Sequence, residues 1–213
     1  LEEGFITVPG GHRAAVAGTV VLDKHEISTI KNISSVSLRI ASEKKGCAAQ
    51  IVKKLFDNGL KNTLIVSPVC GGKTTILRDI LRILSDGGKT VGISDERGEI
   101  AACYMGIPQL DVGERTDVLD CCPKAEGMSM LIRTLSPDIV AADEIGTKED
   151  MAAIRQAGLC GSSVICTAHG DDMESIKKRF AGTDMFERYV FLEGRTCPGK
   201  VKALYDAGGE RLW

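Results

Sequence analysis

Residues 67–74 combine glycine, lysine and threonine in a spacing that suits phosphate binding. The run nearly fits the pattern G-x-x-x-x-G-K-[ST]. Glycines let backbone N–H groups curl around phosphate oxygens, the lysine binds the outer phosphates, and the threonine hydroxyl binds magnesium. A β-branched run at residues 63–66 precedes the loop and a helical pattern at 74–84 follows it, which is the context this motif requires. We expect nucleotide contacts from Ser67, Pro68, Val69, Cys70, Gly71, Gly72, Lys73, Thr74 and Thr75.

The first position of this loop departs from the pattern. Ser67 stands where the pattern has glycine. Gly71 supplies a second flexible residue beside Gly72, so we expect the loop to form. The alternative is an ordinary glycine turn before a helix that happens to contain Lys-Thr.

An apolar strand expected at residues 138–142 ends in two carboxylates, Asp143 and Glu144. Magnesium needs a hard oxygen opposite the loop threonine, which makes Thr74 and Asp143 the expected metal-binding pair. Hydrolysis also needs a carboxylate to orient or deprotonate the attacking water, and we assign that role to Glu144. A solvated acidic strand end is the alternative, which the phosphate loop upstream disfavours.

Two further groups follow strands. Asp95 and Glu96 come just after an apolar run, and ligands of open α/β sheets lie beyond the carboxyl ends of the strands. We expect these carboxylates to share the acid–base or metal work, unless they belong to a charged surface loop. His169 follows another strand, where it could read the γ-phosphate or serve only as a structural loop residue.

The elements that must position these residues are visible as alternating patterns. Strands are expected at residues 63–66, 90–93, 138–142 and 163–167, and helices at 44–56, 74–84, 128–135 and 148–157. Such alternation predicts an α/β fold with a mostly parallel sheet covered on both faces. Two more strands, at residues 189–192 and 201–205, are expected to form a closing hairpin.

Before residue 44 the sequence reads as β-rich, with clear alternation at residues 35–40. We therefore divide the chain into a small β-rich N-terminal portion, residues 1–43, and an α/β domain, residues 44–213. The chain opens Leu1-Glu2-Glu3 without an initiator methionine. We expect the N-terminal portion to be the remnant of a larger domain.

Composition limits the classes of function. Apolar residues make up 43% and charged residues 26% of the 213 residues, which is ordinary for a soluble globular protein. No apolar run approaches the roughly 18–20 residues of a membrane span. A net charge of −2 disfavours nucleic acid as a partner. The eight cysteines include no CxxC pair, so we expect reduced, mostly buried thiols, with Cys70 in the loop as the exception.

The order of these elements carries a resemblance. A phosphate loop, an acidic box, an acidic strand end and a Thr-x-His loop follow one another as in the secretion ATPases, the RecA-like hexameric motors of type II and type IV secretion and type IV pili. Those proteins commonly have glycine where Asp143 stands. A second resemblance, to the stage III sporulation protein AA family, extends over most of the chain. The runs that carry it are residues 33–41, 73–79, 95–97, 115–120, 123–127 and 143–146.

The resemblance implies a RecA-like P-loop NTPase core that takes ATP and Mg²⁺ as cofactors. It implies ATP hydrolysis that powers or supports assembly or transport at a channel between mother cell and forespore. The protein would be cytoplasmic in the mother cell and peripheral at the membrane, held there by membrane proteins of the channel complex. A homo-oligomer, expected to be a hexamer, is implied as well.

In ring ATPases a neighbouring subunit supplies an arginine to the nucleotide site. We prefer Arg115, which lies in a long polar connection, although each candidate could instead make a local salt bridge. The other candidates are Arg13, Arg39, Arg97 and Arg133. Two alternative functions stay open: a nucleotide-binding scaffold with little turnover, suggested by Ser67, and a RecA-like ATPase stimulated by nucleic acid.

Overall fold

The computed structural model describes residues 4–180 and 185–213, so the chain start discussed above lies outside the described residues. The chain divides into two units. One holds the residues up to Glu43 together with Ala101–Asp111, and the other holds Lys44–Ile100 and Val112–Trp213. The sequence predicts a boundary near residue 43 but not the grouping of Ala101–Asp111 with the first unit.

The first unit is built on a three-stranded antiparallel sheet in the order β1-β2-β3. Its strands are β1 (Phe5–Val8), β2 (His12–Asp23) and β3 (Glu26–Arg39). Register pairs Val16 with Val36 and Ala14 with Leu38, so apolar residues share one face. The β-rich N-terminal portion predicted from the sequence is confirmed.

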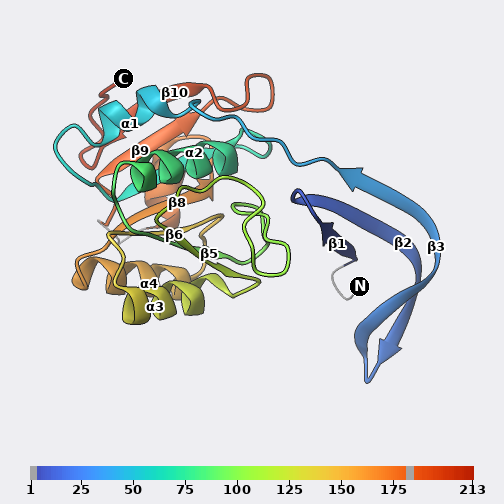
Figure 1. The fold of residues 1–213 in the computed structure, drawn as a ribbon. Helices are drawn as coiled ribbons and strands as arrows, with labels where there is room; N and C mark the ends of the chain where they lie inside the picture. The colour runs from blue at the N-terminus through green and yellow to red at the C-terminus, as the bar shows by residue number, and fades with distance from the viewer. Residues whose placement is uncertain (1–3, 181–184) are drawn as a thin grey trace. The chain divides into compact units, whose positions relative to one another are not determined.

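The second unit contains a seven-stranded sheet in the order β10-β9-β4-β8-β7-β5-β6 (Figure 1). All neighbouring strands run parallel except β10, which pairs antiparallel with β9. Three central strands are fully buried, because apolar and β-branched runs here face helices on both sides. The strands are β4 (Thr63–Ser67), β5 (Val91–Asp95), β6 (Thr116–Asp120), β7 (Ile139–Ala142), β8 (Ser163–His169), β9 (Arg188–Leu192) and β10 (Val201–Asp206).

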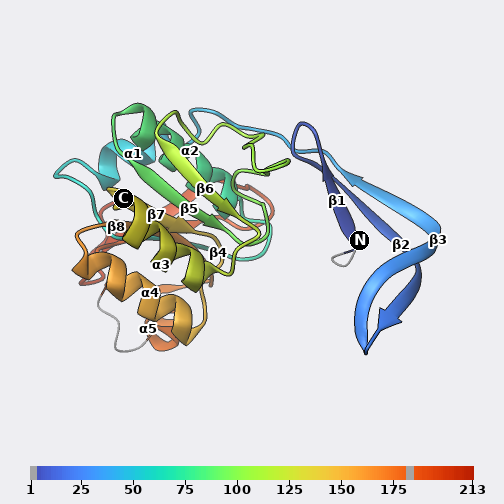
Figure 2. The ribbon, with the colours of Figure 1, turned by 60° about the horizontal axis from the view of Figure 1, so that its bottom comes forward.

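Helices cover both faces of this sheet. On one face lie α1 (Ala49–Leu55) and α2 (Lys73–Asp86), and on the other lie α3 (Lys124–Leu135) and α4 (Lys148–Leu159) (Figure 1). Helix α5 (Met173–Arg179) joins the second group through Ile176, which belongs to the same core as Val140 and Ile154 (Figure 2). The predicted α/β fold with a mostly parallel sheet is confirmed.

Four elements differ from the sequence prediction, and one of them is helix α1, which begins at Ala49 rather than at residue 44. The edge strand β6 and the short helix α5 were not predicted, because each offers too few apolar residues to show a period. Helix α3 begins at Lys124 rather than at residue 128 and includes Gly127. A Cβ at Gly127 would lie 2.1 Å from Ser94 Oγ, so glycine allows the first turn of α3 to approach β5 closely.

All eight cysteines are free thiols, as expected, but the prediction that they are mostly buried was wrong. Cys103 and Cys166 are buried and Cys122 is half-buried. The other five lie in turns, loops and helix ends and are exposed: Cys47, Cys70, Cys121, Cys160 and Cys197.

Asp79 ties the chain before α1 to helix α2. Its carboxylate accepts hydrogen bonds from the N–H of Gly46 (3.0 Å) and of Ala48 (2.8 Å), and it pairs with Arg82 at 2.8 Å. Burial by itself would raise the pKa of Asp79, but these donors together outweigh it and hold the pKa below the ordinary 3.8. The stability that Asp79 contributes is therefore present above about pH 4 and is lost as pH falls through the depressed pKa.

Asp79→Asn is expected to lower the free energy of unfolding at neutral pH by about 1–3 kcal/mol, because a neutral amide replaces an acceptor of charge-assisted hydrogen bonds. The deficit relative to wild type should shrink below about pH 4, where the carboxylate of the unfolded chain is protonated, and should be smallest below the depressed pKa, where the folded carboxylate is neutral as well. Urea unfolding at a series of pH values measures both effects. Asp86→Asn is the control, because Asp86 pairs with the same Arg82 at 3.0 Å but is 43% exposed. Equal losses in the two variants would contradict the prediction.

Candidate functional site

The phosphate loop joins β4 to α2. Strand β4 ends at Ser67, and α2 begins at Lys73 with Gly72 in the N-cap position. Two loop residues are left-handed, Gly72 with φ of 87° and Cys70 with φ of 62°. Gly71 lies outside that region, so the conformational freedom predicted for it is not used.

Gly71 is required for a different reason, the closeness of its neighbours. A Cβ at this position would lie 2.2 Å from Ser67 Oγ and 2.9 Å from the backbone oxygen of Glu193. The Ser67 hydroxyl is buried and donates a hydrogen bond of 2.8 Å to the carbonyl of Pro68. The serine that replaces the first glycine of the pattern is accommodated because residue 71 has no side chain.

The connection between β9 and β10 packs against this loop. The N–H of Gly199 donates to the carbonyl of Gly71 at 2.8 Å. A Cβ at Gly72 would lie 2.6 Å from the Gly199 nitrogen. Two distant parts of the chain therefore shape the phosphate loop together. Of the other predicted loop residues, Val69 is 68% exposed and Thr75 lies in the first turn of α2.

Lys73 begins a chain of polar contacts that crosses the site. Its ammonium nitrogen lies 3.1 Å from His169 Nδ1, and His169 Nε2 lies 2.8 Å from Glu144 Oε1. An ammonium group can only donate, so Nδ1 accepts, and the ring proton is placed on Nε2, from where it is donated to the carboxylate. Lys73 is 5% exposed, and this burial lowers its pKa despite the opposing charges of Asp143 and Glu144.

Thr74 and Asp143, the expected metal-binding pair, are in direct contact. The Thr74 hydroxyl donates to Asp143 Oδ2 at 2.6 Å. The hydroxyl of Thr167 donates to the other oxygen of Asp143 and accepts the N–H of Glu144 at 2.9 Å. Thr167 thus holds both carboxylate residues of the β7 strand end. The sequence analysis gave it no role, although it stands in the Thr-x-His run.

These residues fit a magnesium–nucleotide complex. Magnesium keeps several waters and is bound by one or two protein oxygens together with substrate phosphates. With its proton directed to Asp143, the Thr74 oxygen keeps a lone pair for the ion, and Asp143 can bind a metal-bound water. No group of three or more His, Cys, Asp or Glu residues is placed to hold a metal by itself within residues 4–180 and 185–213.

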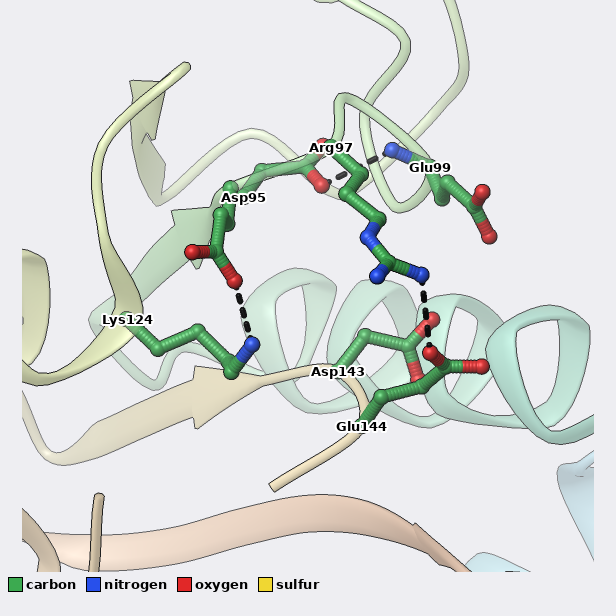
Figure 3. A pocket seen from close by; sticks show the side chains of 7 residues that line it. Asp95, Arg97, Glu99, Lys124, Asp143 and Glu144 are labelled. Atoms are coloured by element: carbon green, nitrogen blue, oxygen red, sulfur yellow. Dashed lines mark hydrogen bonds and ion pairs between the residues drawn. The ribbon is translucent and has the colours of Figure 1, made fainter. Parts of the chain in front are cut away.

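A small pocket opens beside Asp143 and Glu144 (Figure 3). Figure 3 shows Arg97 reaching Glu144, where its NH1 nitrogen lies 3.1 Å from Oε2. Both oxygens of Glu144 are therefore engaged, one by His169 and one by Arg97. The lining residues are Asp95, Glu96, Arg97, Glu99, Lys124, Asp143 and Glu144.

Asp95 and Glu96 both line this pocket but are engaged differently. Asp95 is 2% exposed and accepts the N–H groups of Glu99 and Ile100, so its carboxylate holds the turn that carries Arg97. Glu96 forms an ion pair with Lys124 from the start of α3. The structure thus brings Asp95 and Glu96 to the pocket, where Asp95 accepts hydrogen bonds from the backbone and Glu96 pairs with a lysine.

Arg115 lies away from these residues. It directly precedes β6, its N–H donates to Ser85 Oγ at 2.8 Å, and its carbonyl accepts the N–H of Val91. Because β5 and β6 are parallel, this is the amino end of the strands, roughly 17 Å along β6 from its carboxyl end. The structure does not bring Arg115 to the phosphate loop of its own chain. Of the other candidates in this unit, Arg97 contacts the site, and Arg133 is near the end of α3.

Comparison with known proteins shows the family. The family model of sporulation stage III, protein AA matches residues 1–212. The chain belongs to this family. It is 42% identical over 222 residues to Stage III sporulation protein AA of Bacillus subtilis (strain 168), an alignment that covers 100% of this chain and 72% of the relative. The family resemblance stated from sequence motifs is confirmed.

Solved structures show the fold. The ATPase DotB of Legionella pneumophila matches with a TM-score of 0.56 and 17% identity, over 84% of this chain and 52% of that chain. The pilus retraction motor PilT with bound ADP matches with a TM-score of 0.56 and 12% identity, over 84% of this chain and 54% of that chain. The chain spans about half the length of these structures, and the likeness shows a P-loop ATPase fold.

Gly71→Ala is expected to weaken binding of a fluorescent ADP analogue at least about 10-fold, or roughly 1.4 kcal/mol. The new methyl group would have to displace Ser67 or the backbone at Glu193, and either shift moves the N–H groups that face the phosphates. Gly158→Ala is the control, since a Cβ there meets nothing within 4 Å and the residue lies in α4. Unchanged affinity in Gly71→Ala would contradict the steric role.

Proposed function

We propose that the chain is a magnesium-dependent ATPase of the secretion type, whose turnover powers or supports assembly or transport at a mother cell–forespore channel during sporulation. The observation that carries the proposal is the contact chain from Lys73 through His169 to Glu144. It links the residue that would hold the outer phosphates to the carboxylate that would activate water. A glycine turn or a solvated acidic strand end would not need such a link.

In this proposal ATP lies with its β- and γ-phosphates in the loop, at the N-terminus of α2. Lys73 then exchanges His169 for phosphate oxygens. Thr74 and Asp143 would hold a magnesium ion, which would supply positive charge against the phosphates. His169 loses or regains its lysine partner as the γ-phosphate comes and goes, and it passes that change to Glu144 through Nε2–H.

Glu144 acts as the base for the attacking water. Since both of its oxygens are engaged, it has to release one partner before it can accept a proton. Arg97 is the weaker partner, because its side chain is 69% exposed and an exposed ion pair stabilises little. Glu96 shares the acid–base work when it separates from Lys124. Asp95 contributes by holding the turn that carries Arg97.

The wider role follows from the family and from the likeness to secretion motors. We propose a homo-oligomer, a hexamer by analogy with those motors, in which Arg115 serves the site of a neighbouring copy. The protein would work in the mother cell cytoplasm and bind membrane proteins of the channel complex. Among the described residues, no helix has both the length and the apolar character that crossing a bilayer requires.

Two variants separate hydrolysis from a scaffold role. Lys73→Ala is expected to abolish nucleotide binding and phosphate release, because the buried ammonium is the cation nearest the phosphates. Glu144→Gln should keep ADP-analogue affinity while lowering kcat at least about 100-fold, since an amide cannot accept the proton. Magnesium-dependent phosphate release measures both.

Lys89→Ala is the control, because Lys89 lies at the other end of the sheet beside Asp138. Turnover in Lys73→Ala equal to wild type would sink the ATPase proposal. Binding without phosphate release in wild type would favour the scaffold, and strong stimulation by DNA or RNA would favour a nucleic-acid motor.

A mixing experiment tests the role of Arg115. Arg115→Ala and Lys73→Ala are each expected to be nearly inactive alone. Mixed together they should regain phosphate release, because a Lys73→Ala copy can supply its Arg115 to the intact phosphate loop of an Arg115→Ala copy. Full activity of Arg115→Ala alone, or no recovery on mixing, would contradict an action in trans.

A further inference from the structure

Arg179, the last residue of α5, reaches back to the two loops that carry the proposed catalytic groups. Its NH1 nitrogen donates to the carbonyl of His169 at 3.0 Å. Its NH2 nitrogen is 3.5 Å from the carbonyl of Ile145, next to Glu144. One guanidinium therefore contacts the loop after β7 and the end of β8 at the same time.

Gly146 makes room for this contact. A Cβ at Gly146 would lie 2.3 Å from Arg179 NH2. The backbone of Gly146 does not need glycine for its conformation, since it is not among the left-handed residues. Its N–H donates to Asp150 Oδ2 at 2.9 Å, in the capping box of α4, so the backbone here is held in place. The glycine is therefore explained by the space that the guanidinium occupies.

We propose that Arg179 is a positioning residue that fixes the distance between His169 and Glu144. His169 Nε2 lies 2.8 Å from Glu144 Oε1, and the two residues stand on separate segments, the end of β8 and the loop after β7. The guanidinium joins these segments through their main-chain carbonyls. Charged donors make stronger hydrogen bonds than neutral ones, and the planar fork of arginine suits two acceptors at once. Lysine has a single nitrogen on a flexible stem and would hold one loop at a time.

Glu144 needs such support. Its backbone is left-handed, with φ of 53°, a strained conformation for a residue with a side chain. On one side its N–H is held by Thr167 Oγ1, and on the other side Arg179 holds Ile145. The N–H of Ile145 also donates to the carbonyl of Thr167 at 2.9 Å, so loss of Arg179 releases only the carbonyl side of this loop. A displacement of about 1 Å at a catalytic group can cost on the order of 100-fold in rate.

The kinetic test rests on the proposed ATPase function. Arg179→Ala is expected to lower kcat at least about 10-fold while KM for ATP and ADP-analogue affinity stay within about 2-fold, because Lys73 and Thr74 are untouched. Arg179→Lys should recover part of kcat. Lys178→Ala, an exposed neighbour on α5, should behave as wild type.

Gly146→Ala provides an independent test of the same contact. The new Cβ meets the far end of a flexible side chain, so it should expel the guanidinium without breaking the backbone. We expect the same fall in kcat as in Arg179→Ala, and the double variant should be no slower than either single variant. Effects that multiply in the double variant would overturn the inference.

Amide hydrogen exchange tests the inference without relying on turnover. Peptides covering residues 144–147 and 169–170 should exchange faster in Arg179→Ala than in Lys178→Ala, with the phosphate loop unchanged. Wild-type turnover in Arg179→Ala, equal losses of kcat and nucleotide affinity, or unchanged exchange in both peptides would each overturn the positioning role. If wild type releases no phosphate, the ATPase proposal fails, and the exchange measurement alone decides the role of Arg179.

Discussion

The buried charge of Lys73 is the constraint from which the rest of the site follows. An ammonium group with 5% exposure must be met by acceptors, because a buried charge without partners is costly. His169 meets it with Nδ1, and this settles which ring nitrogen carries the proton and hence that Glu144 is the next acceptor. Phosphate oxygens are stronger acceptors for an ammonium group than a neutral imidazole nitrogen. In the proposed function, one lysine would therefore link nucleotide binding to rearrangement of the site.

Much of this arrangement was predictable from the sequence, because it depends on local pattern. The phosphate loop, the apolar strands and the acidic strand end are runs of neighbouring residues, and parallel strands bring their carboxyl ends together. The contacts of Thr167 and Arg179 were not predictable, since each joins segments that are distant in the chain. The position of Arg115 at the amino end of β6 was not predictable, because β6 has too few apolar positions to be recognised as a strand.

The two ends of the parallel sheet carry different kinds of polar contact. At the carboxyl ends, Lys73 and His169 contact each other, and Glu144, the next residue in that contact chain, lines a pocket together with other carboxylates. At the amino ends, Asp138 accepts the N–H of Thr90 at 2.8 Å and its hydroxyl at 3.0 Å, which ties β7 to the start of β5. Thr90 and Asp138 there satisfy each other and the backbone. At the carboxyl ends, a ligand could instead exchange the contacts that the charged groups make with one another.

The close approach of Ser67 and Gly71 has a consequence for how this loop can diverge among related chains. The two positions share one small volume, which either a hydroxymethyl group at 67 or a side chain at 71 can fill, but not both. Through Glu193, the same volume is also bounded by the connection after β9. We expect residues 67 and 71 to covary: chains that keep serine at the first position keep glycine at the fifth. In chains with glycine first, only the backbone oxygen of Glu193 still restricts the fifth position. Serine at position 67 is then compensated by glycine at position 71, because the two positions cannot both carry a side chain.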